Sequence, residues 1–402
     1  MVKESKNKIV VGLTNSSDSK AAAYLLNRQG YEVLAVTFLY SPKNSKQNGD
    51  KKIKKPEEIG HKCRVKNVKD IKNFCQKLGI QHLGFFSFDE FKDEVIDSCI
   101  SFRLKTASDN PCYSCSKLTL KLLSQKASEL GAEFISTGHY AKVHFSKTTK
   151  SYFLNAANDI ESDQSFLLAK VKQDILCKLI LPLGDLRKVE VQKISERKGW
   201  STELRADEFG KCLSDNRFDQ YINKNVANSL FKTGNIIFNN DDLSVGTHEG
   251  LHLQKFGEKF VGTLYPTTAT GDYVVVNINR YNGDLFIEKK NRVFVKRIFL
   301  NDVRLRASAV LTKPKHIVIK IEGRQGVYSS VIHFKNNNSC LIILEKKINE
   351  IFPSGTHVTF YEKLLGGRLS VLGSGRVKYE VKFLEINGDK QDEEKRSEEF
   401  EF

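Results

Sequence analysis

The stretch KIVVGLTNSSDSKAAAY (residues 8–24) joins an apolar segment to a loop of hydroxyl and amide side chains and then to a helical run. We expect a strand at Lys8–Leu13, because apolar residues run through it, and a helix at Ser19–Gln29. A strand, a short loop and a helix in this order can bind an anion, since backbone N–H groups and the helix dipole face the loop. The loop Thr14–Ser19 lacks the Walker pattern GxxxxGK[ST], and Ser and Asp are also ordinary helix caps. The loop alone therefore leaves nucleotide binding and a plain strand-to-helix turn both open.

The first two hundred residues continue this alternation of strand and helix patterns. The later segments are a strand at Glu32–Leu39, helices at Val68–Leu78, Phe88–Arg103 and Ser116–Leu130, and a strand at Glu133–Thr137. Strands that alternate with helices are typical of a parallel sheet covered by helices on both faces. We therefore predict an α/β domain with a doubly wound parallel sheet.

The second half of the chain has a different pattern. From Asn235 to Phe383 the segments are short, rich in Val, Ile, Phe and Thr, and separated by turn signals such as Asn282-Gly283. This pattern predicts an all-β structure in two small units with a seam near Arg292. The tail Asp389–Phe402 carries seven acidic and three basic residues and is expected to be disordered.

Composition and charge limit the class of protein. The 402 residues are 40% hydrophobic and 28% charged, as in an ordinary globular protein. No apolar run approaches the roughly 20 residues of a membrane-spanning helix, and the first residues lack a signal-peptide core, so we expect a cytoplasmic protein without membrane contact. The net charge of +16 indicates either a polyanionic partner such as nucleic acid or a general lysine bias. The Lys-rich stretch Ser41–Lys69 is predicted to be a loop, either a solvated insertion or a flexible contact to RNA phosphates.

Eight cysteines in a cytoplasmic chain are expected to be thiols. Five of them lie in apolar stripes or runs, or in a basic stretch without a nearby partner, and we assign them to packing. These five are Cys63, Cys75, Cys99, Cys177 and Cys340. The remaining three, Cys112, Cys115 and Cys212, have no such explanation and are candidates for chemistry.

The motif NPCYSC (residues 110–115) places two thiols immediately before the predicted helix at Ser116–Leu130. A helix dipole favours the thiolate of a cysteine at this end. Three interpretations are open at this point. The pair could belong to a zinc site completed by His139 and Cys212, or form a thioredoxin-like redox pair. Alternatively, one thiol of the pair acts with Cys212, which lies in the polar segment 207–215.

Several segments, taken in order, resemble the tRNA-specific 2-thiouridylases of the MnmA/TrmU type, which are PP-loop ATP pyrophosphatases. The similar segments are Lys8–Tyr24, NPCYSC (110–115), LGAEFISTGHYAKV (130–143), SDQSFLL (162–168), LPLGDLRKVEVQKISERKGW (181–200) and GKCLSDNRFDQYI (210–222). Weaker likeness at Gly246–Gly257 and Pro353–Tyr361 extends the resemblance to about residue 383. No single motif is decisive, but the ordered set is specific.

The resemblance implies an architecture of three domains and a tail. Residues 1–207 would form a PP-loop catalytic domain, 208–290 a small central domain and 291–385 a β-barrel, followed by an acidic disordered tail at 386–402. It also implies two partners, which are tRNA and a sulfur-relay protein or cysteine desulfurase that donates sulfur.

The reaction that the resemblance implies replaces the C2 oxygen of the anticodon wobble uridine by sulfur. ATP, with Mg²⁺ expected, would adenylate that oxygen and release pyrophosphate. A persulfide on Cys212 would deliver the sulfur atom, and Cys115 would release the product. A transient Cys115–Cys212 disulfide would remain and be reopened by a reductant.

The same resemblance assigns two further sets of residues. The expected nucleotide-binding residues are Gly12, Leu13, Thr14, Asn15, Ser16, Asp18, Ser19, Phe38 and Gly138. The expected RNA-binding residues are Cys112, His139, Asp163 and Gln164. A hydrogen-bonded structural histidine is an alternative for His139, as a surface helix cap is for Asp163 and Gln164. No metal ligands are expected.

The loop departs from the family pattern SGGxDS, because Asn15 and Ser16 replace both glycines. Glycines at these positions permit positive φ angles and a close approach of phosphate to the backbone. We therefore expect strain of about 1–3 kcal/mol at each replacement and weaker use of ATP.

The segment before the thiols departs from the family as well. The family sequence RTPNP is ASDNP here (residues 107–111), which removes an arginine, and Cys112 stands where Asp is frequent. These departures leave two alternatives to a wobble-uridine thiolase. One is a non-catalytic tRNA-binding paralogue, and the other is thiolation of another RNA or another position.

Overall fold

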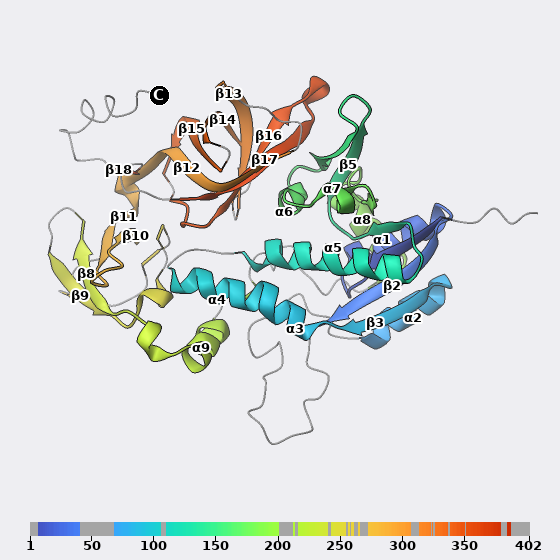
Figure 1. The fold of residues 1–402 in the computed structure, drawn as a ribbon, viewed down its shortest axis with the longest axis horizontal. Helices are drawn as coiled ribbons and strands as arrows, with labels where there is room; N and C mark the ends of the chain where they lie inside the picture. Colours follow the sequence, from blue (N-terminus) through green and yellow to red (C-terminus); the bar gives the residue numbers. More distant parts are fainter. Residues whose placement is uncertain are drawn as a thin grey trace, which may run out of the picture.

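The computed structural model of the protein describes most of the chain (Figure 1). The described residues are 7–40, 68–105, 110–200, 212–213, 216–239, 243–254, 256–257, 259–260, 264–265, 272–306, 313–322, 324, 326–336, 338–349, 351–378 and 384–386. Two predicted segments lie outside these ranges, and the predictions made for them stay predictions. They are the Lys-rich stretch Ser41–Lys69 except its last two residues, which includes Cys63, and the tail Asp389–Phe402.

A five-stranded parallel sheet forms the first part of the molecule. Its strands, in spatial order, are β3 (Gln81–Phe86), β2 (Glu32–Leu39), β1 (Lys8–Gly12), β4 (Phe134–Ser136) and β7 (Leu179–Ile180). The main helices around it are α1 (Ser17–Arg28), α2 (Val68–Leu78), α5 (Pro111–Glu129) and α8 (Lys188–Arg197). Alternate residues of β1 point to opposite faces of the sheet. Ile9 and Val11 pack with α1 and α2, and Val10 packs with α5, which confirms the doubly wound parallel sheet.

The segment expected as one helix at Phe88–Arg103 has three parts. They are α3 (Phe88–Phe91), a π-helical turn (Lys92–Ile96) and α4 (Asp97–Leu104). The apolar spacing predicted a helical segment but not the π turn inside it, which inserts one residue and leaves Arg103 buried rather than Phe102.

Helix α5 begins at Pro111, so the prediction that both thiols precede the helix is wrong. The side chain of Asn110 is the N-cap and accepts a hydrogen bond from the Cys112 N–H at 2.8 Å. Pro111 occupies the first helical position, where a missing N–H costs nothing. Cys112 therefore lies in the first turn, and Cys115 lies one turn further along the helix.

From Gly234 onward the described elements are β-strands and 3₁₀ turns, as predicted. A four-stranded sheet has the order β10 (Tyr273–Ile278), β11 (Leu285–Lys289), β8 (Gly234–Phe238), β9 (Ser244–His248). Helix α9 (Asn216–Asn225) and the 3₁₀ turns Asn228–Leu230 and Leu251–Leu253 accompany it. The 3₁₀ turn Lys290–Arg292 leads into the next sheet, close to the predicted seam.

The last sheet closes into a six-stranded antiparallel β-barrel. Its strands are β12 (Val293–Leu305), β15 (Ser339–Ile348), β14 (Tyr328–Asn336), β13 (Lys315–Ile321), β16 (His357–Lys363) and β17 (Leu369–Val377), with a 3₁₀ turn at Leu365–Gly367. Strand β17 pairs back with β12, which closes the ring. Strand β18 (Leu384–Ile386) adds to the outer edge of β12.

One hairpin of the first half joins the barrel sheet. It consists of β5 (Ala141–Ser146) and β6 (Ser151–Ala156), followed by the short helices α6 (Ser165–Leu168) and α7 (Gln173–Leu176). Asn155 of β6 pairs with Ser370 of β17. The barrel is therefore built directly onto the connection that follows β4, beside helix α5 (Figure 1).

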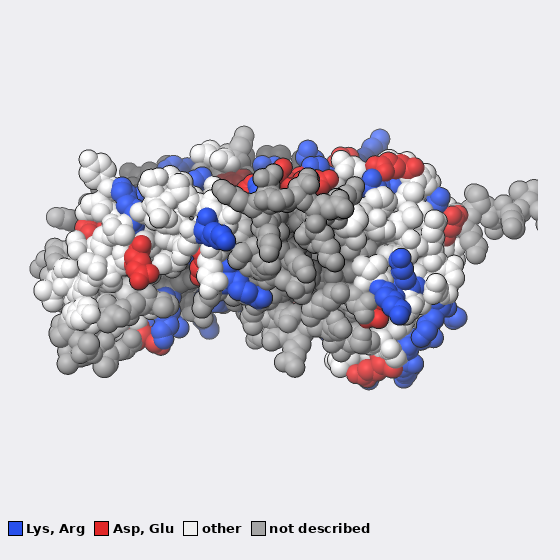
Figure 2. All heavy atoms as spheres, turned by 90° about the horizontal axis from the view of Figure 1, so that it is seen from below, with Lys and Arg blue, Asp and Glu red and all other residues white. Residues whose placement is uncertain are grey.

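The described surface is not uniformly basic. On the face drawn in Figure 2, Lys and Arg side chains are scattered and interspersed with Asp and Glu. Within the described ranges, no helix is both long and apolar enough to cross a bilayer.

Candidate active site

The loop between β1 and α1 folds without backbone strain. Ser16 is the N-cap of α1, with φ −66° and ψ 145°, and its hydroxyl accepts a hydrogen bond from the Ser19 N–H. Among the described residues, the non-glycine positions with positive φ are Lys150, Leu213 and Asp302. The expected strain at Asn15 and Ser16 is therefore absent. The reason is that this loop uses the extended conformation of an ordinary N-cap, which any residue can adopt.

Hydroxyl groups fill the inside of this loop. The Thr14 hydroxyl lies 3.0 Å from the Ser16 hydroxyl and 3.1 Å from that of Ser19. The Ser19 hydroxyl also accepts a hydrogen bond from the Thr14 N–H at 3.0 Å. Backbone N–H groups that a glycine loop would offer to a ligand are thus bonded here to side-chain oxygens.

Asp18 carries the negative charge of the loop. Two residues that the sequence analysis did not identify contact its carboxylate. The Lys188 ammonium lies 2.7 and 2.5 Å from its two carboxylate oxygens. The Tyr140 hydroxyl donates a hydrogen bond to the same carboxylate at 2.9 Å. Burial and the Asp18 charge raise the pKa of Tyr140 well above its usual range, so it remains a proton donor. Lys188 lies 170 positions from Asp18, and only the similarity of the segment 181–200 to the family could have drawn attention to it.

Gly138 lies directly against the loop. A Cβ atom there would lie 2.7 Å from the Ser19 nitrogen and 2.8 Å from the Asp18 carbonyl carbon, closer than real Cβ contacts allow. The loop after β4 thus approaches the start of α1 at a distance that only glycine permits. Gly12, by contrast, faces the side chains of Leu123 and Thr137.

The other residues expected at the nucleotide are buried. Leu13 belongs to the core on the α1 and α2 face of the sheet, and Phe38 belongs to the core on the α5 face. Asn15 is also buried, within the loop itself. Their side chains therefore pack the structure around the loop rather than line an open surface.

His139 connects this region to the thiol helix. Its Nδ1 atom lies 2.8 Å from the Thr137 hydroxyl, and its Nε2 atom lies 3.3 Å from the hydroxyl of Ser116, the residue after Cys115. Burial lowers the pKa of His139 to about 4, against a smaller opposing effect of Asp18. The imidazole is therefore neutral at pH 7, and it holds the two elements together as a hydrogen-bonded residue.

The three candidate thiols share one apolar cluster. Cys112 and Cys212 are buried in it, with Cys212 only 4% exposed, and the half-buried Cys115 packs against it. None of the three forms a disulfide bond within the described part of the chain. The described residues contain no group of three or more His, Cys, Asp or Glu side chains that could hold a metal ion, so nothing in them completes the zinc site considered above.

Tyr40 is the neighbour of Cys115 that sequence reasoning missed. Its hydroxyl lies 3.3 Å from that of Thr119, one helical turn after Cys115, and its ring stacks on Phe91. Burial and the nearby Cys115 thiol raise the pKa of Tyr40 well above its usual range. Tyr40 lies just after β2, beside the predicted residue Phe38, so its place at the carboxyl edge of the sheet was the available signal.

The fold and this geometry can be compared with known proteins. A family model described as tRNA methyl transferase HUP domain matches residues 7–216, just over half of the chain. A tRNA-specific 2-thiouridylase MnmA of Treponema denticola is 30% identical over 79% of this chain and 83% of its own length. The chain belongs to the tRNA-specific 2-thiouridylase family. Its relatives include the proteins of the same name from Halothermothrix orenii (27% identical, 92% of this chain and 99% of that one) and Clostridium beijerinckii (28% identical, 90% and 98%).

In this member of the 2-thiouridylase family, Asp163 is a buried link to the barrel. Its carboxylate accepts hydrogen bonds from the Ala157 N–H and from the N–H and hydroxyl of Ser165. The Tyr361 hydroxyl of β16 reaches it at 3.3 Å, and the Lys320 ammonium lies 3.7 Å away. Burial raises its pKa, with Lys320 opposing. These contacts place the Asp163 carboxylate at the start of α6 in a buried position, not at the surface as the capping alternative expected, and its contact to RNA stays a prediction.

Gln164 connects the same turn to the site. Its side-chain oxygen accepts a hydrogen bond from the Tyr140 N–H at 3.1 Å, and its own N–H donates to the Tyr140 carbonyl at 2.7 Å. Gln164 thus fixes the backbone of the residue that binds Asp18.

The barrel also contacts the start of α5. His357 of β16 stacks on Tyr113, between the two thiols, with ring centroids 3.5 Å apart. Burial and the charge of Arg376 lower the pKa of His357 well below its usual range. Arg376 lies over the ring of Phe102 in α4, 4.3 Å from its centroid. The barrel therefore contacts the candidate site on the side of the thiol motif.

The assignments of the remaining cysteines are mostly confirmed. Cys75, Cys99 and Cys340 are buried in apolar cores. Cys177 is exposed, so its assignment to packing was wrong. It follows the short helix α7, where Leu176 is buried and Ile175 is partly buried, and its thiol donates a hydrogen bond to the Asp174 carbonyl.

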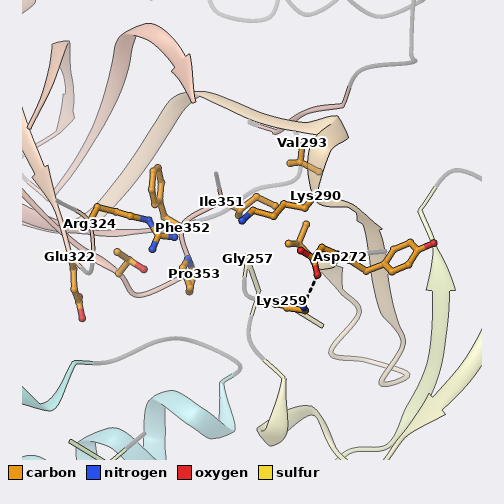
Figure 3. A pocket seen from close by; sticks show the side chains of 13 residues that line it. Gly257, Lys259, Asp272, Lys290, Val293, Glu322, Arg324, Ile351, Phe352 and Pro353 are labelled. Atoms are coloured by element: carbon orange, nitrogen blue, oxygen red, sulfur yellow. Dashed lines mark hydrogen bonds and ion pairs between the residues drawn. The ribbon is translucent and has the colours of Figure 1, made fainter. Parts of the chain in front are cut away.

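A cavity of about 330 Å³ lies at the seam between β10 and the barrel, and Figure 3 shows the side chains that line it. Lys259, Lys290 and Arg324 contribute positive charge to its wall, and Lys259 is paired with Asp272 at 2.5 Å. No residue predicted for nucleotide, RNA or sulfur chemistry lines this cavity. It therefore adds nothing to the candidate site around Asp18 and Cys115.

Proposed function

We propose that this chain is a cytoplasmic tRNA 2-thiouridylase that uses ATP to replace the C2 oxygen of the wobble uridine by sulfur. The observation that supports the proposal is a direct connection between the candidate ATP loop and the helix that carries Cys115. The loop after β4 touches the start of α1 through Gly138 and the Cys115 helix through His139 and Ser116. A nucleotide at the amino end of α1 and a substrate base at Cys115 would then be neighbours.

The first half of the reaction creates a leaving group. The uridine O2 attacks the α-phosphorus of ATP, the bond from that phosphorus to the bridging oxygen breaks, and the electron pair leaves with pyrophosphate. The start of α1 suits the phosphates because its N–H groups and dipole face the loop. Mg²⁺ would neutralise further phosphate charge. A carbonyl oxygen alone is a poor leaving group, whereas AMP is a good one.

The second half transfers sulfur. The terminal sulfur of a Cys212 persulfide, supplied by a sulfur-relay protein or cysteine desulfurase, attacks C2, and AMP departs. The Cys115 thiolate then attacks the inner sulfur of Cys212, which forms a Cys115–Cys212 disulfide and releases the 2-thiouridine as its anion. A reductant reopens the disulfide.

This step requires Cys212 to leave its buried position. Cys212 is 4% exposed and lies in an apolar cluster, where a persulfide donor could not reach it. The next residue, Leu213, has a φ of 55°, an unfavourable angle for a leucine. Strain of this kind is commonly found at segments that change conformation during function. We propose that substrate binding exposes Cys212.

A second cavity supports RNA as the partner. It has a volume of about 270 Å³ and lies between β6, the segment around α7 and the barrel. Its charged lining residues are Lys170, Lys172, Arg304 and Arg306, all positive. Asp302 pairs with Lys170 and Arg304, and Glu362 pairs with Arg306, so part of this charge is balanced within the protein. Such a group of cations suits the phosphate backbone of a tRNA.

The test is mass analysis of tRNA nucleosides from cells that lack the protein. We expect the 2-thio modification at the wobble uridine to disappear and to return when the chain is supplied in trans. The Cys212→Ser variant should not restore it, although it should bind tRNA as the unaltered chain does. Unchanged wobble thiolation in the deletion strain, with no second enzyme present, would contradict the proposal.

A non-catalytic tRNA-binding protein is the second candidate, and the loop favours it. The Thr14, Ser16 and Ser19 hydroxyls bond to one another where a glycine loop would receive phosphate. Pyrophosphate release in the presence of tRNA distinguishes the two functions. ATP-dependent release supports the thiouridylase, and its absence with every sulfur donor tested supports the binding protein.

A further inference from the structure

Tyr281 lies in the turn that joins β10 to β11, residues 279–284, which we call the β10–β11 tip. It is 91% exposed, which makes it the most exposed aromatic residue in the described part of the chain. An aromatic ring in this position buries almost no apolar surface on folding, so it adds little to the stability of the protein. Its apolar faces are open to a partner instead.

Hydrogen bonds fix the turn that carries the ring. The Asn279 N–H donates to the Asp284 carbonyl at 2.8 Å, and the Gly283 N–H donates to the Asn279 carbonyl at 2.9 Å. The side-chain oxygen of Asn279 accepts a hydrogen bond from the Tyr281 N–H at 3.0 Å. Gly283 packs so closely that a Cβ atom there would lie 2.1 Å from the carbonyl oxygen of Thr233, just before β8. The tip is therefore already ordered and loses little backbone entropy on binding.

Two cations lie beside the ring. The Lys232 ammonium donates hydrogen bonds to the Arg280 and Tyr281 carbonyls at 2.7 and 2.6 Å, and it lies 5.9 Å from the centroid of the Tyr281 ring. Both Lys232 and Arg280 are exposed. The acidic residue of the tip is Asp284, whose carboxylate accepts a hydrogen bond from the Asn282 side chain at 2.6 Å. An exposed ring next to cations is the combination that binds a base and its phosphates in single-stranded nucleic acid.

The β10–β11 tip also lies close to the thiol motif. The Arg280 guanidinium donates a hydrogen bond to the carbonyl of Lys105, the residue after α4. Lys105 precedes Asn110, the N-cap of the helix that carries Cys115, by five positions. The Cα atoms of Lys105 and Asn110 are therefore at most about 18 Å apart. An RNA loop that brings its target base to Cys115 can also reach the tip.

We propose that Tyr281 binds tRNA by stacking its ring on an unpaired nucleobase, with Lys232 and Arg280 beside the neighbouring phosphates. The inference rests on the proposed function in taking tRNA as the substrate. A ring stacks on any base, because every base has a π face, so this contact supplies affinity and position rather than sequence preference. The neighbouring cations favour a polyanion over a protein as the partner of the ring.

The experiment measures tRNA binding to the full-length protein by fluorescence anisotropy, without ATP and at several salt concentrations. The probe is an unmodified, labelled tRNA transcript with a uridine at the wobble position. The variants are Tyr281→Ala, Tyr281→Phe and Tyr281→Trp. Tyr265→Ala is the matched control, because Tyr265 is a second exposed tyrosine, bonded through its N–H to the Val245 carbonyl of β9.

We expect Tyr281→Ala to weaken tRNA binding by about five- to a hundredfold, the usual range for one stacked base. The slope of log affinity against log salt should not change, because no charge is removed. Tyr281→Phe and Tyr265→Ala should bind as the unaltered chain does. Tyr281→Trp should bind at least as tightly, and tRNA should quench the emission that this substitution adds to that of Trp200, the single tryptophan of the chain.

Three results would overturn the role of Tyr281 alone. The first is tRNA binding by Tyr281→Ala within about twofold of the unaltered chain. The second is an equal loss of affinity in Tyr265→Ala, which would make the effect unspecific. The third is unchanged tRNA affinity with slower sulfur transfer from a donor protein, which would assign the tip to that protein.

The failure of the proposed function gives a different pattern. An unaltered chain that binds no tRNA would overturn both the proposed function and the role of Tyr281. A chain that binds tRNA through Tyr281 but leaves wobble-uridine thiolation unchanged on deletion would support the stacking contact and overturn the thiouridylase. A thermal unfolding midpoint equal to that of the unaltered chain checks that Tyr281→Ala is folded.

Discussion

The Nε2 atom of His139 lies 3.3 Å from the hydroxyl of Ser116, which joins the edge of the parallel sheet to the helix of the thiol motif. His139 follows Gly138, which touches the start of α1, and Ser116 follows Cys115. Two consecutive residues on each side thus connect the candidate ATP loop to the candidate sulfur chemistry. A substitution at either end of this connection should therefore alter the structure at the other end.

The buried state of His139 predicts a pH dependence of stability. The unfolded histidine takes up a proton below about pH 6.5, whereas burial lowers the native pKa to about 4. Between these values the unfolded state binds more protons, so stability falls as the pH drops. The loss attributable to His139 is at most about 3 kcal/mol.

Urea unfolding at pH 7 and pH 5 measures this effect. His139→Gln keeps a polar atom near Ser116 but cannot titrate, so its stability should fall less than that of the unaltered chain between the two pH values. Comparing the two proteins cancels the contributions of other histidines with lowered pKa, such as His357 and His252. Equal losses in both proteins would show that His139 is not buried as a neutral ring.

Gly138→Ala should disrupt the candidate nucleotide site. The added methyl group would lie 2.7 Å from the Ser19 nitrogen, and both neighbours are backbone that cannot move aside cheaply. We expect a loss of about 1–3 kcal/mol in the free energy of unfolding, as for other overpacked sites, and weaker ATP binding. Gly84→Ala is the control, because the nearest atom to its added methyl group is a leucine carbon at 3.9 Å. An equal effect of the two substitutions would contradict the close approach of Gly138 to the loop.

The parallel sheet could be predicted because its signal is local. Each strand and helix of the first half carries its own apolar spacing, and their alternation permits few topologies. The barrel was less accessible from its residues alone, since closure depends on β17 pairing back with β12 across some seventy residues. Short strands and turns predict β structure, but they do not specify which distant strands meet.

The site shows the same difference. Asn110 and Pro111 are a local capping signal, and the start of α5 could have been read from them. The pairing of Asp18 with Lys188, by contrast, depends on the fold, because no spacing rule links two residues 170 positions apart. Resemblance to a family indicated which segments matter, and only the coordinates indicated that Asp163 is buried beneath the barrel and that Cys177 is exposed.

The cysteines should react with N-ethylmaleimide in an order set by burial. We expect Cys177 to be modified first and the half-buried Cys115 more slowly, while Cys75, Cys212 and Cys340 stay protected until the protein unfolds. Burial also raises the pKa of Cys75 to about 11, which lowers its thiolate fraction further. Peptide mass mapping over time gives the order.

Adding substrates tests the proposed exposure of Cys212 by the same method. ATP and tRNA together should increase the modification rate of Cys212 but not that of Cys75, which serves as an internal control in the opposite core. A Cys212 that remains protected with both substrates bound would contradict its proposed role as persulfide carrier.

The cationic cavity beside β6 should contribute to tRNA affinity through charge alone. Arg304 is 65% exposed and Lys172 is also exposed, so both can meet phosphates without rearrangement of the core. Replacing either by alanine should weaken tRNA binding at low salt and reduce the slope of log affinity against log salt by about 1, because one fewer counterion is released. Lys346→Ala, an exposed lysine of β15 outside this cavity, is the charge-matched control and should leave the slope unchanged. Equal slopes for all three variants would place the RNA on another face of the protein.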